Sequence, residues 1–462
     1  MMAASQNNST PPSVGSSDGT EPGSSSKVEF PLHECVYKGK IKKIPHLLRH
    51  HDIDEKDMHG NTPLHLAVML GQKEIAMLLL ARNATVKIRN THGWSPLAEA
   101  ISYGDRQTVS SLLRKLKSQS REQMDRRRPA LVAALHQIPD FYMEIKWDFQ
   151  TWVPLLHRIL PSDTCKIYKR GASIRLDTTL VDFADFKWER GDISFLFNGD
   201  APPSQSLCVL DNKLRVYQTV RYEETELEIE EEIDILMSSD IVSAQMSTKS
   251  ITFTRSQQGW FFRSDRKEMV GKYDADFYDV HGVVLETRKR REHLSAEDLQ
   301  KNKALMDTIT RGSAHQLDTE EIREPPHRTS LEPPAAPAIS WEEYLTADPA
   351  NAPHVGRAII SKVSCKRFKN ATLAMSQQFP LTVSMLLDVL DVVAPFKHFS
   401  KLKQFVQCKL PPGFPVKLDI PLIPAITAQI TFQDFYFEDS HPSHLFTVPA
   451  EYTEDPARFP DL

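Results

Sequence analysis

The chain has 462 residues, enough for about three domains of ordinary size with a large core that needs no disulfides or metals. Hydrophobic residues make up 40% and charged residues 25%, which excludes a small disulfide scaffold, a fibrous protein and a fully disordered chain. The net charge of −5 lacks the basic excess that is typical of nucleic-acid-binding proteins. Five widely spaced cysteines, none in a CxxC pair, favour reduced thiols in the cytosol.

The N-terminal segment, 1–27, consists mostly of Ser, Gly, Pro, Thr and Asn. It has too few apolar side chains to offset the entropy of ordering, so we expect a disordered tail. It also lacks the basic and apolar regions of a signal peptide. The most apolar window, 381–396, contains two aspartates and a proline and is shorter than the roughly 20 uncharged residues of a membrane span. We therefore expect any membrane association to be peripheral.

Three landmarks repeat with a common period from Phe30 onward. They are the prolines Pro31, Pro63 and Pro96, the glycines Gly39, Gly71 and Gly104, and the leucine pairs 47–48, 79–80 and 112–113. Thr62 and Pro63 form a typical helix start, and Gly71 a left-handed helix end. The period of about 33, the string Thr-Pro-Leu-His at 62–65 and the paired leucines resemble ankyrin repeats. We expect repeats at about 57–89 and 90–122, after a degenerate first repeat at about 28–56.

The ankyrin region is expected to extend over 28–143. Pro129 lies one further period beyond Pro96, which predicts a modified helix that caps the stack. Stacked repeats present a continuous concave face, so the side chains near the hairpin tips are candidates for protein binding. These candidates are Asp57, His59, Asn90, His92 and Trp94. The two histidines have an alternative role, which is to order their own turns.

Beyond about Glu144 the hydrophobic period changes from 3.6 toward 2, and turn signals separate short β-branched or aromatic segments. This pattern predicts an antiparallel meander in a β-rich part at 144–310. The acidic run 223–234 fits either a helix that crosses the sheet or a solvated edge. Residues 295–307 resemble a helix that Ser295 caps.

Prolines and few large apolar residues in 311–340 predict a flexible insert. The C-terminal part, 341–462, is expected to contain a helix at 382–394, an extended segment at 410–421 and a strand at 427–437. The sequence therefore predicts an α+β multidomain protein, with an N-terminal α-helical ankyrin stack followed by an antiparallel β-rich domain with additional helices.

Motifs for catalysis or cofactor binding are absent: the sequence has no GxGxxG, GxxxxGK[ST], HExxH or GxSxG. We expect no enzyme, no cofactor, no metal and no catalytic residue. His441 and His444 have an HxxH spacing, but Pro442 between them favours a turn over a metal site. A nucleophilic Cys165 or Cys208 is the weakest alternative, because a lone cysteine in a strand pattern is usually a buried small residue.

The densest basic cluster lies at 288–291, with the sequence Arg-Lys-Arg-Arg. It fits a nuclear-import signal or a site for anionic lipid headgroups. The favoured interpretation is a solvated end between a strand and a helix.

Several long strings resemble the ankyrin repeat domain-containing protein 13 family. They lie at 126–131, 137–142, 146–155, 161–171 and 410–417, and the resemblance covers nearly everything from Phe30 to about Phe437. That family joins ankyrin repeats to a domain described as a chaperone for G-protein-coupled receptors. Several members carry C-terminal ubiquitin-interacting motifs and act on ubiquitinated cargo at endosomal membranes. No such motif follows Phe437, which points to the C branch of the family.

The resemblance implies an ATP-independent chaperone at the cytosolic face of the endoplasmic reticulum. It would bind the cytosolic loops or tail of newly made G-protein-coupled receptors and regulate their biogenesis and their exit to the cell surface. The alternative is an ankyrin scaffold or adaptor in endocytic or ubiquitin-dependent sorting of membrane receptors. Either role implies a cytoplasmic protein with peripheral membrane association and no nucleic-acid partner, and the sequence does not indicate an oligomeric state.

Overall fold

The fold comes from a computed structural model that describes residues 30–151, 160–184, 187–221, 223–247, 250–259, 263–300, 327–336, 338–348, 353–367, 371–385, 387, 410–423, 426–438 and 441–459. The expected tail at 1–27 lies outside these residues, as does most of the helix expected at 382–394. Of the helix expected at 295–307, the described part is 295–300, in which 296–300 is helical. The backbone N–H of Asp298 donates to the Ser295 hydroxyl at 3.1 Å, as the expected cap requires.

The N-terminal region is a stack of short helices whose ends follow the sequence landmarks. Pro63 and Pro96 each occupy a first helical turn, and Thr62 and Ser95 cap those helices through their hydroxyls. Gly71 has a φ of 67°, and a Cβ there would collide with the Tyr103 hydroxyl, so only glycine fits this turn. The elements are α1 (Pro31–Tyr37), η1 (Ile41–Lys43), α2 (Ile44–Leu47), α3 (Pro63–Met69), α4 (Lys73–Ala81), α5 (Pro96–Tyr103) and α6 (Arg106–Gln137).

The helix expected around Pro129 is the second half of a longer helix. One continuous helix, α6, runs for 32 residues with Pro129 inside it, which is about 48 Å at 1.5 Å per residue. Its first half buries Leu112 and Leu113 in the ankyrin core, and its last turns bury Leu135 in a second core. Packing at both ends offsets the hydrogen bond that the proline removes.

The second region is one large sheet, antiparallel except for its last pair, and it contains strands from both the β-rich part and the C-terminal part. Its strand order is β11-β12-β15-β16-β17-β1-β2-β3-β4-β5-β6-β18, with β8 also paired to β12. The run β1 to β6 confirms the expected meander, although β1 begins at Phe141 and not near Glu144. The reason is that Phe141 pairs with Phe437 of β17 and is buried.

The strands of this sheet are β1 (Phe141–Thr151), β2 (Ser162–Arg170), β3 (Ser173–Ala184), β4 (Lys187–Asn198), β5 (Leu207–Asp211), β6 (Val216–Thr219), β8 (Thr252–Arg255), β11 (Lys267–Val270), β12 (Tyr273–His281), β15 (Ala371–Ser376), β16 (Phe414–Ile423), β17 (Ile426–Phe437) and β18 (Thr453–Glu454). The segments expected to be extended at 410–421 and 427–437 correspond to β16 and β17. Smaller elements are the β9–β10 hairpin (Gln257–Gln258 and Ser264–Asp265), η3 (Pro203–Gln205) and η6 (Ser443–Phe446).

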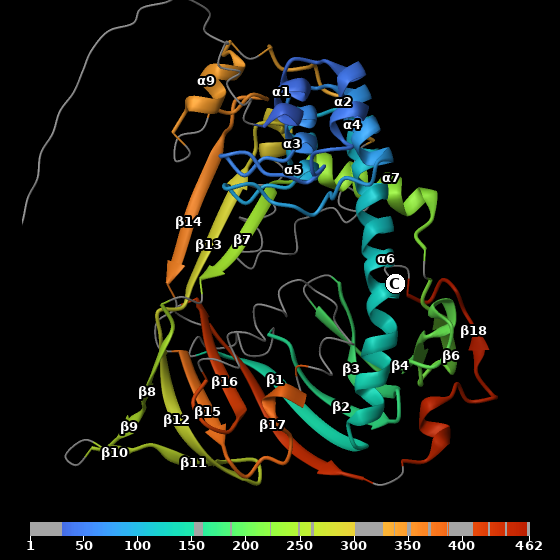
Figure 1. Cartoon of the computed structure of the whole chain (residues 1–462). Helices are drawn as coiled ribbons and strands as arrows, with labels where there is room; N and C mark the ends of the chain where they lie inside the picture. The colour runs from blue at the N-terminus through green and yellow to red at the C-terminus, as the bar shows by residue number, and fades with distance from the viewer. Residues whose placement is uncertain are drawn as a thin grey trace, which may run out of the picture.

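A three-stranded sheet links the two regions on the side opposite α6 (Figure 1). Its order is β14-β13-β7, with β7 at Ile241–Ser247, β13 at Val284–Arg290 and β14 at Ser361–Arg367. Figure 1 shows these strands running from the ankyrin helices down to the large sheet. The ankyrin stack is therefore joined to the β-rich region by the sheet on one side and by α6 on the other.

Segments from beyond the ankyrin region complete the ankyrin core. Helix α7 (Glu226–Ser238) buries Ile229, Ile233 and Met237, which share one face at i, i+4 and i+8. The acidic run thus forms a helix, but it packs on α6 and does not cross the sheet. Its acidic side chains meet basic ones of α6, as in the Arg114–Glu226 pair at 2.6 Å.

The described parts of the expected flexible insert, 327–336 and 338–340, are held against the ankyrin stack. The backbone N–H of Leu331 donates to the Gly104 carbonyl at 2.8 Å, and the Ser330 hydroxyl accepts from the Arg106 N–H at 3.0 Å. Directly after the insert, helix α9 (Trp341–Thr346) buries Trp341 and Tyr344 in the ankyrin core. The confirmed fold class, an ankyrin stack followed by a β-rich region with helices, therefore has two regions with interleaved chain segments.

Candidate functional site at the ankyrin hairpin tips

The two hairpin tips lie one repeat apart and share one arrangement, in which a side-chain oxygen accepts hydrogen bonds from backbone N–H groups of its own turn. The Asp57 carboxylate accepts from the backbone N–H of His59 at 2.9 Å and of Asn61 at 2.8 Å. The Asn90 side-chain oxygen accepts from the Trp94 N–H at 3.0 Å. The tips are also joined to each other, because the Asn90 amide donates to the Asn61 side-chain oxygen at 3.0 Å. Asp57 and Asn90 therefore shape the tips from inside.

The histidine of the Thr-Pro-Leu-His string is structural. His65 accepts the Thr62 backbone N–H at Nδ1 (3.1 Å), so its Nε2–H is the donor to the Trp94 carbonyl (3.1 Å). Burial lowers the pKa of His65 to about 4, which keeps the ring neutral, and the two hydrogen bonds select this tautomer. This residue thereby fixes the second tip to the repeat before it.

Helix α9 covers the first tip. The Tyr344 hydroxyl donates to Asp57 at 2.7 Å, and the His59 ring donates from Nε2 to the Tyr344 carbonyl at 2.8 Å. The His59 and Tyr344 rings also meet edge to face, with centroids 4.7 Å apart. Burial and the neighbouring Asp57 carboxylate raise the pKa of Tyr344, so it remains a hydrogen-bond donor. A segment far away in the sequence is thus bound at this tip.

The second tip faces a buried charge cluster. Glu99 lies one repeat after the buried Leu66 and occupies the equivalent place in its repeat, but with a carboxylate. Arg290 at the end of β13 donates to this carboxylate at 2.9 Å, and both side chains are fully buried. The Arg290 guanidinium also lies 5.1 Å from the centroid of the Trp94 ring. A strand of the three-stranded sheet therefore closes against the third repeat through this pair.

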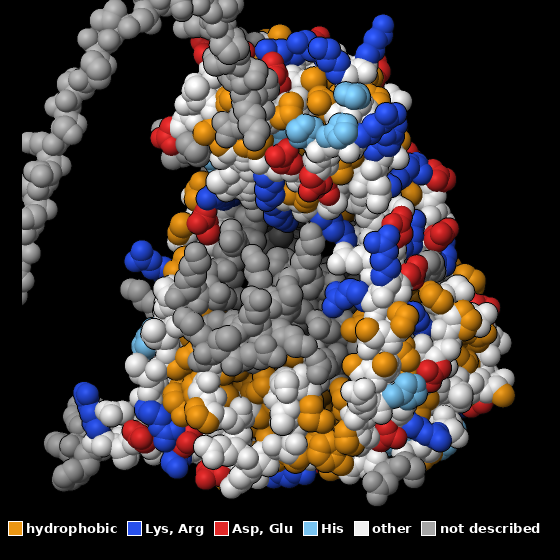
Figure 2. Space-filling view, in the orientation of Figure 1, with side chains coloured by type: hydrophobic (Ala, Val, Ile, Leu, Met, Phe, Trp, Pro, Cys, Tyr) orange, Lys and Arg blue, Asp and Glu red, His pale blue; other side chains and the backbone are white. Residues whose placement is uncertain are grey.

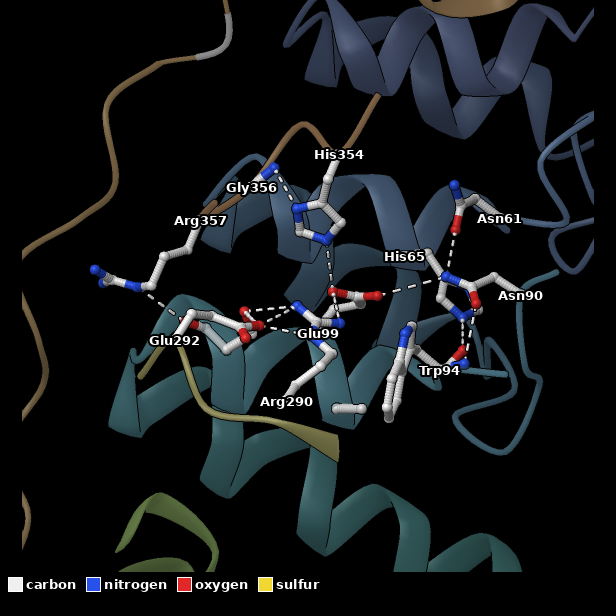
Figure 3. A network of polar contacts seen from close by, with 12 residues as sticks. Asn61, His65, Asn90, Trp94, Glu99, Arg290, Glu292, His354, Gly356 and Arg357 are labelled. Carbon is white, nitrogen blue, oxygen red and sulfur yellow. Dashed lines mark hydrogen bonds and ion pairs between the residues drawn. The ribbon is translucent and has the colours of Figure 1, made fainter. Parts of the chain in front are cut away.

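Three more side chains complete what we call the Arg290 cluster, namely Ser102, Glu292 and His354. Figure 3 shows Glu292 and His354 beside Arg290 and Glu99. Arg290 donates to Glu292 and to the Ser102 hydroxyl at 2.6 and 2.7 Å. His354 accepts the Gly356 N–H at Nδ1, so its Nε2–H donates to Glu99 at 3.0 Å. Burial alone would raise the pKa of Glu99, but the Arg290 charge and the His354 hydrogen bond outweigh it and hold that pKa at about 2.

The basic string at 288–291 is not a solvated end, contrary to the favoured interpretation, because Arg290 is buried and its neighbours are paired. Arg291 donates to Asp240 at 2.8 and 2.9 Å, and Lys289 lies 3.5 Å from the same carboxylate. Arg288 pairs with Glu286 at 2.5 Å and donates to the His92 carbonyl at 3.0 Å. These contacts give the string a role in holding the sheet to the ankyrin stack.

The structure brings all five predicted tip residues together, in contact with other segments of the same chain. Asp57, His59 and Trp94 are buried, and Asn90 and His92 are half-buried. Binding of a partner by these residues stays a prediction, and it would require access past α9 and the Arg290 cluster. The alternative role for His59, which is to order its own turn, does not account for its ring, because the ring binds α9.

Sequence reasoning missed the residues that cover the tips, Tyr344 and Arg290. A signal existed for the second: Glu99 is a charged residue at the repeat position where Leu66 is buried, which demands a buried cation. Nothing in the repeat pattern points to Tyr344.

Other candidate residues have structural surroundings. His441 donates from Nε2 to the Phe141 carbonyl at 2.9 Å and is buried, and in the part of the chain that the structure describes no group of three His, Cys, Asp or Glu side chains is suited to a metal. Burial raises the pKa of Cys165, and it raises that of Cys208 to about 11. Both thiols are therefore poor nucleophiles at neutral pH. Among the described residues, no helix is long and apolar enough to cross a bilayer.

Comparison with known proteins covers both regions. The chain matches the family described as "ANKRD13 C-terminal" over residues 175–458 and "Ankyrin repeats (3 copies)" over 32–123. It is 61% identical to human ankyrin repeat domain-containing protein 13C over 440 residues, which is 95% of this chain and 80% of that protein. A zebrafish (Danio rerio) 13C protein is 60% identical, covering 94% of this chain and 88% of its own length. Mouse ankyrin repeat domain-containing protein 13D is 37% identical over 88% of this chain and 69% of its own. The chain belongs to the ankyrin repeat domain-containing protein 13 family, and within it the chain is more similar to the 13C proteins than to the 13D protein.

Proposed function

We propose that this chain is a binding protein that holds the cytosolic loops or tail of newly made G-protein-coupled receptors at the cytosolic face of the endoplasmic reticulum. The observation that carries the proposal is the family membership, which extends over the ankyrin repeats and the C-terminal region together. The receptor-chaperone role is what resemblance to this family implies. Ankyrin repeats in turn support a protein-binding role.

The geometry favours the three-stranded sheet over the hairpin tips as the place for an extended receptor segment. Strand β14 pairs with β13 on one side, and its outer edge has no partner among the described strands. Its side chains are exposed except for the half-buried Lys366. Val363 is 57% exposed, and Ile360 just before the strand is 64% exposed. An open edge of this kind can accept a further strand through main-chain hydrogen bonds, with alternate side chains providing specificity.

The chain would act as a holdase, which binds and releases by mass action without a nucleotide cycle. The proposal is supported by the lack of phosphate-binding motifs in the sequence. Purified protein should not hydrolyse ATP. Turnover that survives removal of contaminants would contradict this part of the proposal.

The test is to recover the full-length chain from cells that express a receptor and to determine which glycans the co-purified receptor carries. Receptor with immature glycans places the encounter in the endoplasmic reticulum and supports the proposal. Mature, ubiquitinated receptor would assign the chain to endocytic or ubiquitin-dependent sorting, and no receptor would leave only an ankyrin scaffold.

A matched pair of variants locates the binding edge. Val363→Asp places a charge on β14 and should reduce receptor recovery several-fold. Met269→Asp places the same charge on β11, at a residue that is 62% exposed, and should leave recovery unchanged. Equal recovery with both variants would move the binding surface away from β14.

A further inference from the structure

The free end of the ankyrin stack carries a concentration of positive charge. Between residues 38 and 51 the chain has four lysines, one arginine and three histidines, and it has no aspartate or glutamate. The whole chain has a net charge of −5, so this segment departs sharply from the average. Figure 2 shows Lys and Arg side chains along this end of the molecule, with His side chains beside them. We call Lys40, Lys42, Lys43 and Arg49, with Ile41 among them, the basic end.

The backbone of the basic end is fixed. Gly39 adopts a φ of 65°, and the Lys40 N–H donates back to the Cys35 carbonyl at 2.8 Å, as at a helix C-terminus that ends in a left-handed residue. The Lys43 N–H then donates to the Lys40 carbonyl at 3.0 Å. The lysines are therefore displayed by an ordered turn, and their arrangement does not have to form upon binding.

The side chains of the basic end are exposed and have no ion pair within the described part of the chain. Lys38, which precedes them, differs because it pairs with Glu34 at 2.7 Å and Glu342 at 3.3 Å. Ile41 is 37% exposed among these charges. An exposed aliphatic side chain flanked by cationic side chains is a feature of surfaces that lie at a membrane interface.

Two other basic segments of this chain are neutralised by the fold. Arg114 and Lys117 of α6 pair with acidic residues of α7 or just before it. Arg290 and Arg291 pair with buried or half-buried carboxylates. A polar cap on the free end of a repeat stack promotes solubility, but charges of either sign would do so. The uniform sign of the basic end thus indicates an anionic partner.

We propose that the basic end binds the surface of membranes rich in anionic phospholipids, with Ile41 at the level of the headgroups. Each Lys or Arg close to such a surface strengthens binding about fivefold, so the four residues together suffice for reversible peripheral attachment. A lipid surface fits the basic end better than a nucleic acid does, because the chain as a whole is acidic and the aliphatic Ile41 side chain would gain nothing from contact with a phosphate backbone. The inference deepens the proposed function, since it names the surface that would keep the chain at a membrane.

The test is co-sedimentation of the full-length chain with vesicles that contain no receptor. Vesicles of phosphatidylcholine and phosphatidylserine in equal amounts should retain the chain at low salt and release it at high salt. Vesicles of phosphatidylcholine alone should not retain it. Failure to bind the mixed vesicles at low salt would overturn the proposal, and so would equal binding to both kinds. Receptor recovery is a separate assay, so failure of the proposed function would leave this result intact.

Variants identify the surface. The triple variant Lys40→Glu, Lys42→Glu, Lys43→Glu should lose vesicle binding by more than about 100-fold, and Ile41→Ser should weaken it several-fold. The matched control reverses three charges elsewhere, at Arg126, Lys213 and Lys267, and should retain binding. All these positions are on the surface, so thermal unfolding should stay near that of the wild type. Equal losses in the triple variant and the control would overturn the proposal, as would preferential binding to RNA over vesicles.

Discussion

Removing Arg290 should destabilise the protein far more than removing Glu99, although the two form one ion pair. Arg290→Met leaves the carboxylates of Glu99 and Glu292 buried without a cation, and their side chains are 0% and 1% exposed. A buried charge that loses its partner costs about 3 to 5 kcal/mol. Glu99→Leu leaves Arg290 paired with Glu292 at 2.6 Å and restores the leucine of the preceding repeat, so it should cost about 1 kcal/mol.

The pKa of Glu99 gives an independent estimate of how much its partners stabilise the ionised carboxylate relative to the protonated one. Its fall from 4.5 to about 2 corresponds to about 3 kcal/mol of stability at neutral pH. Because the folded-state pKa is lowered, this contribution is present above pH 4.5 and is lost as the pH falls through about 2. In Arg290→Met the buried carboxyls would instead have raised pKa values and gain from protonation. The difference in free energy of unfolding between the wild type and Arg290→Met should therefore be smaller at pH 5 than at pH 7.

The assay is hydrogen exchange at the amides of α5 and β13, together with urea unfolding of the full-length chain, at both pH values. Arg290→Met should increase exchange in both elements at pH 7, and Glu99→Leu should leave them close to the wild type. Equal destabilisation by the two variants would refute the assignment of Arg290 as the shared cation of two carboxylates. A difference in unfolding free energy between Arg290→Met and the wild type that does not change with pH would refute the burial of those carboxylates.

Three further variants and reactions test the covered tip and the thiols. Tyr344→Phe removes the donor to Asp57 and should cost about 2 kcal/mol, seen as faster exchange at the first tip; unchanged exchange would contradict the contact. Trp341→Ala should cost about 3 kcal/mol or more and expose 338–348 to proteolysis, whereas wild-type resistance would mean that α9 is held by other residues. An alkylating reagent at pH 8 should modify the exposed Cys365 before Cys208, because burial raises the pKa of Cys208 to about 11; mass spectrometry gives the order, and modification of Cys208 before Cys365 would count against its burial.

Local patterns were sufficient to predict the elements whose cause is local. The prolines, Thr62 and Gly71 mark helix ends because capping and left-handed turns depend on a few neighbouring residues. The meander from β2 to β5 follows from alternation and turn residues for the same reason. The interpretation of the Arg-Lys-Arg-Arg string is wrong, because burial of Arg290 depends on the Glu99 carboxylate in a distant part of the sequence.

Long-range assembly could not be derived from one sequence. The face formed by Ile229, Ile233 and Met237 has a clear helical spacing, yet its partner, α6, lies far earlier in the chain. The pairing of Phe141 with Phe437 likewise joins residues that no local pattern connects. The same holds for the binding site, since repeat periodicity located the hairpin tips but not the segments that cover them.

The most direct test of this account is hydrogen exchange of the full-length chain with and without the cytosolic tail of a receptor that co-purifies with it. We predict that the tail protects the amides of β14, while 57–61, 90–94 and α9 remain as protected as in the free chain. New protection at the tips, accompanied by faster exchange in α9, would contradict the account and show that receptors displace this helix.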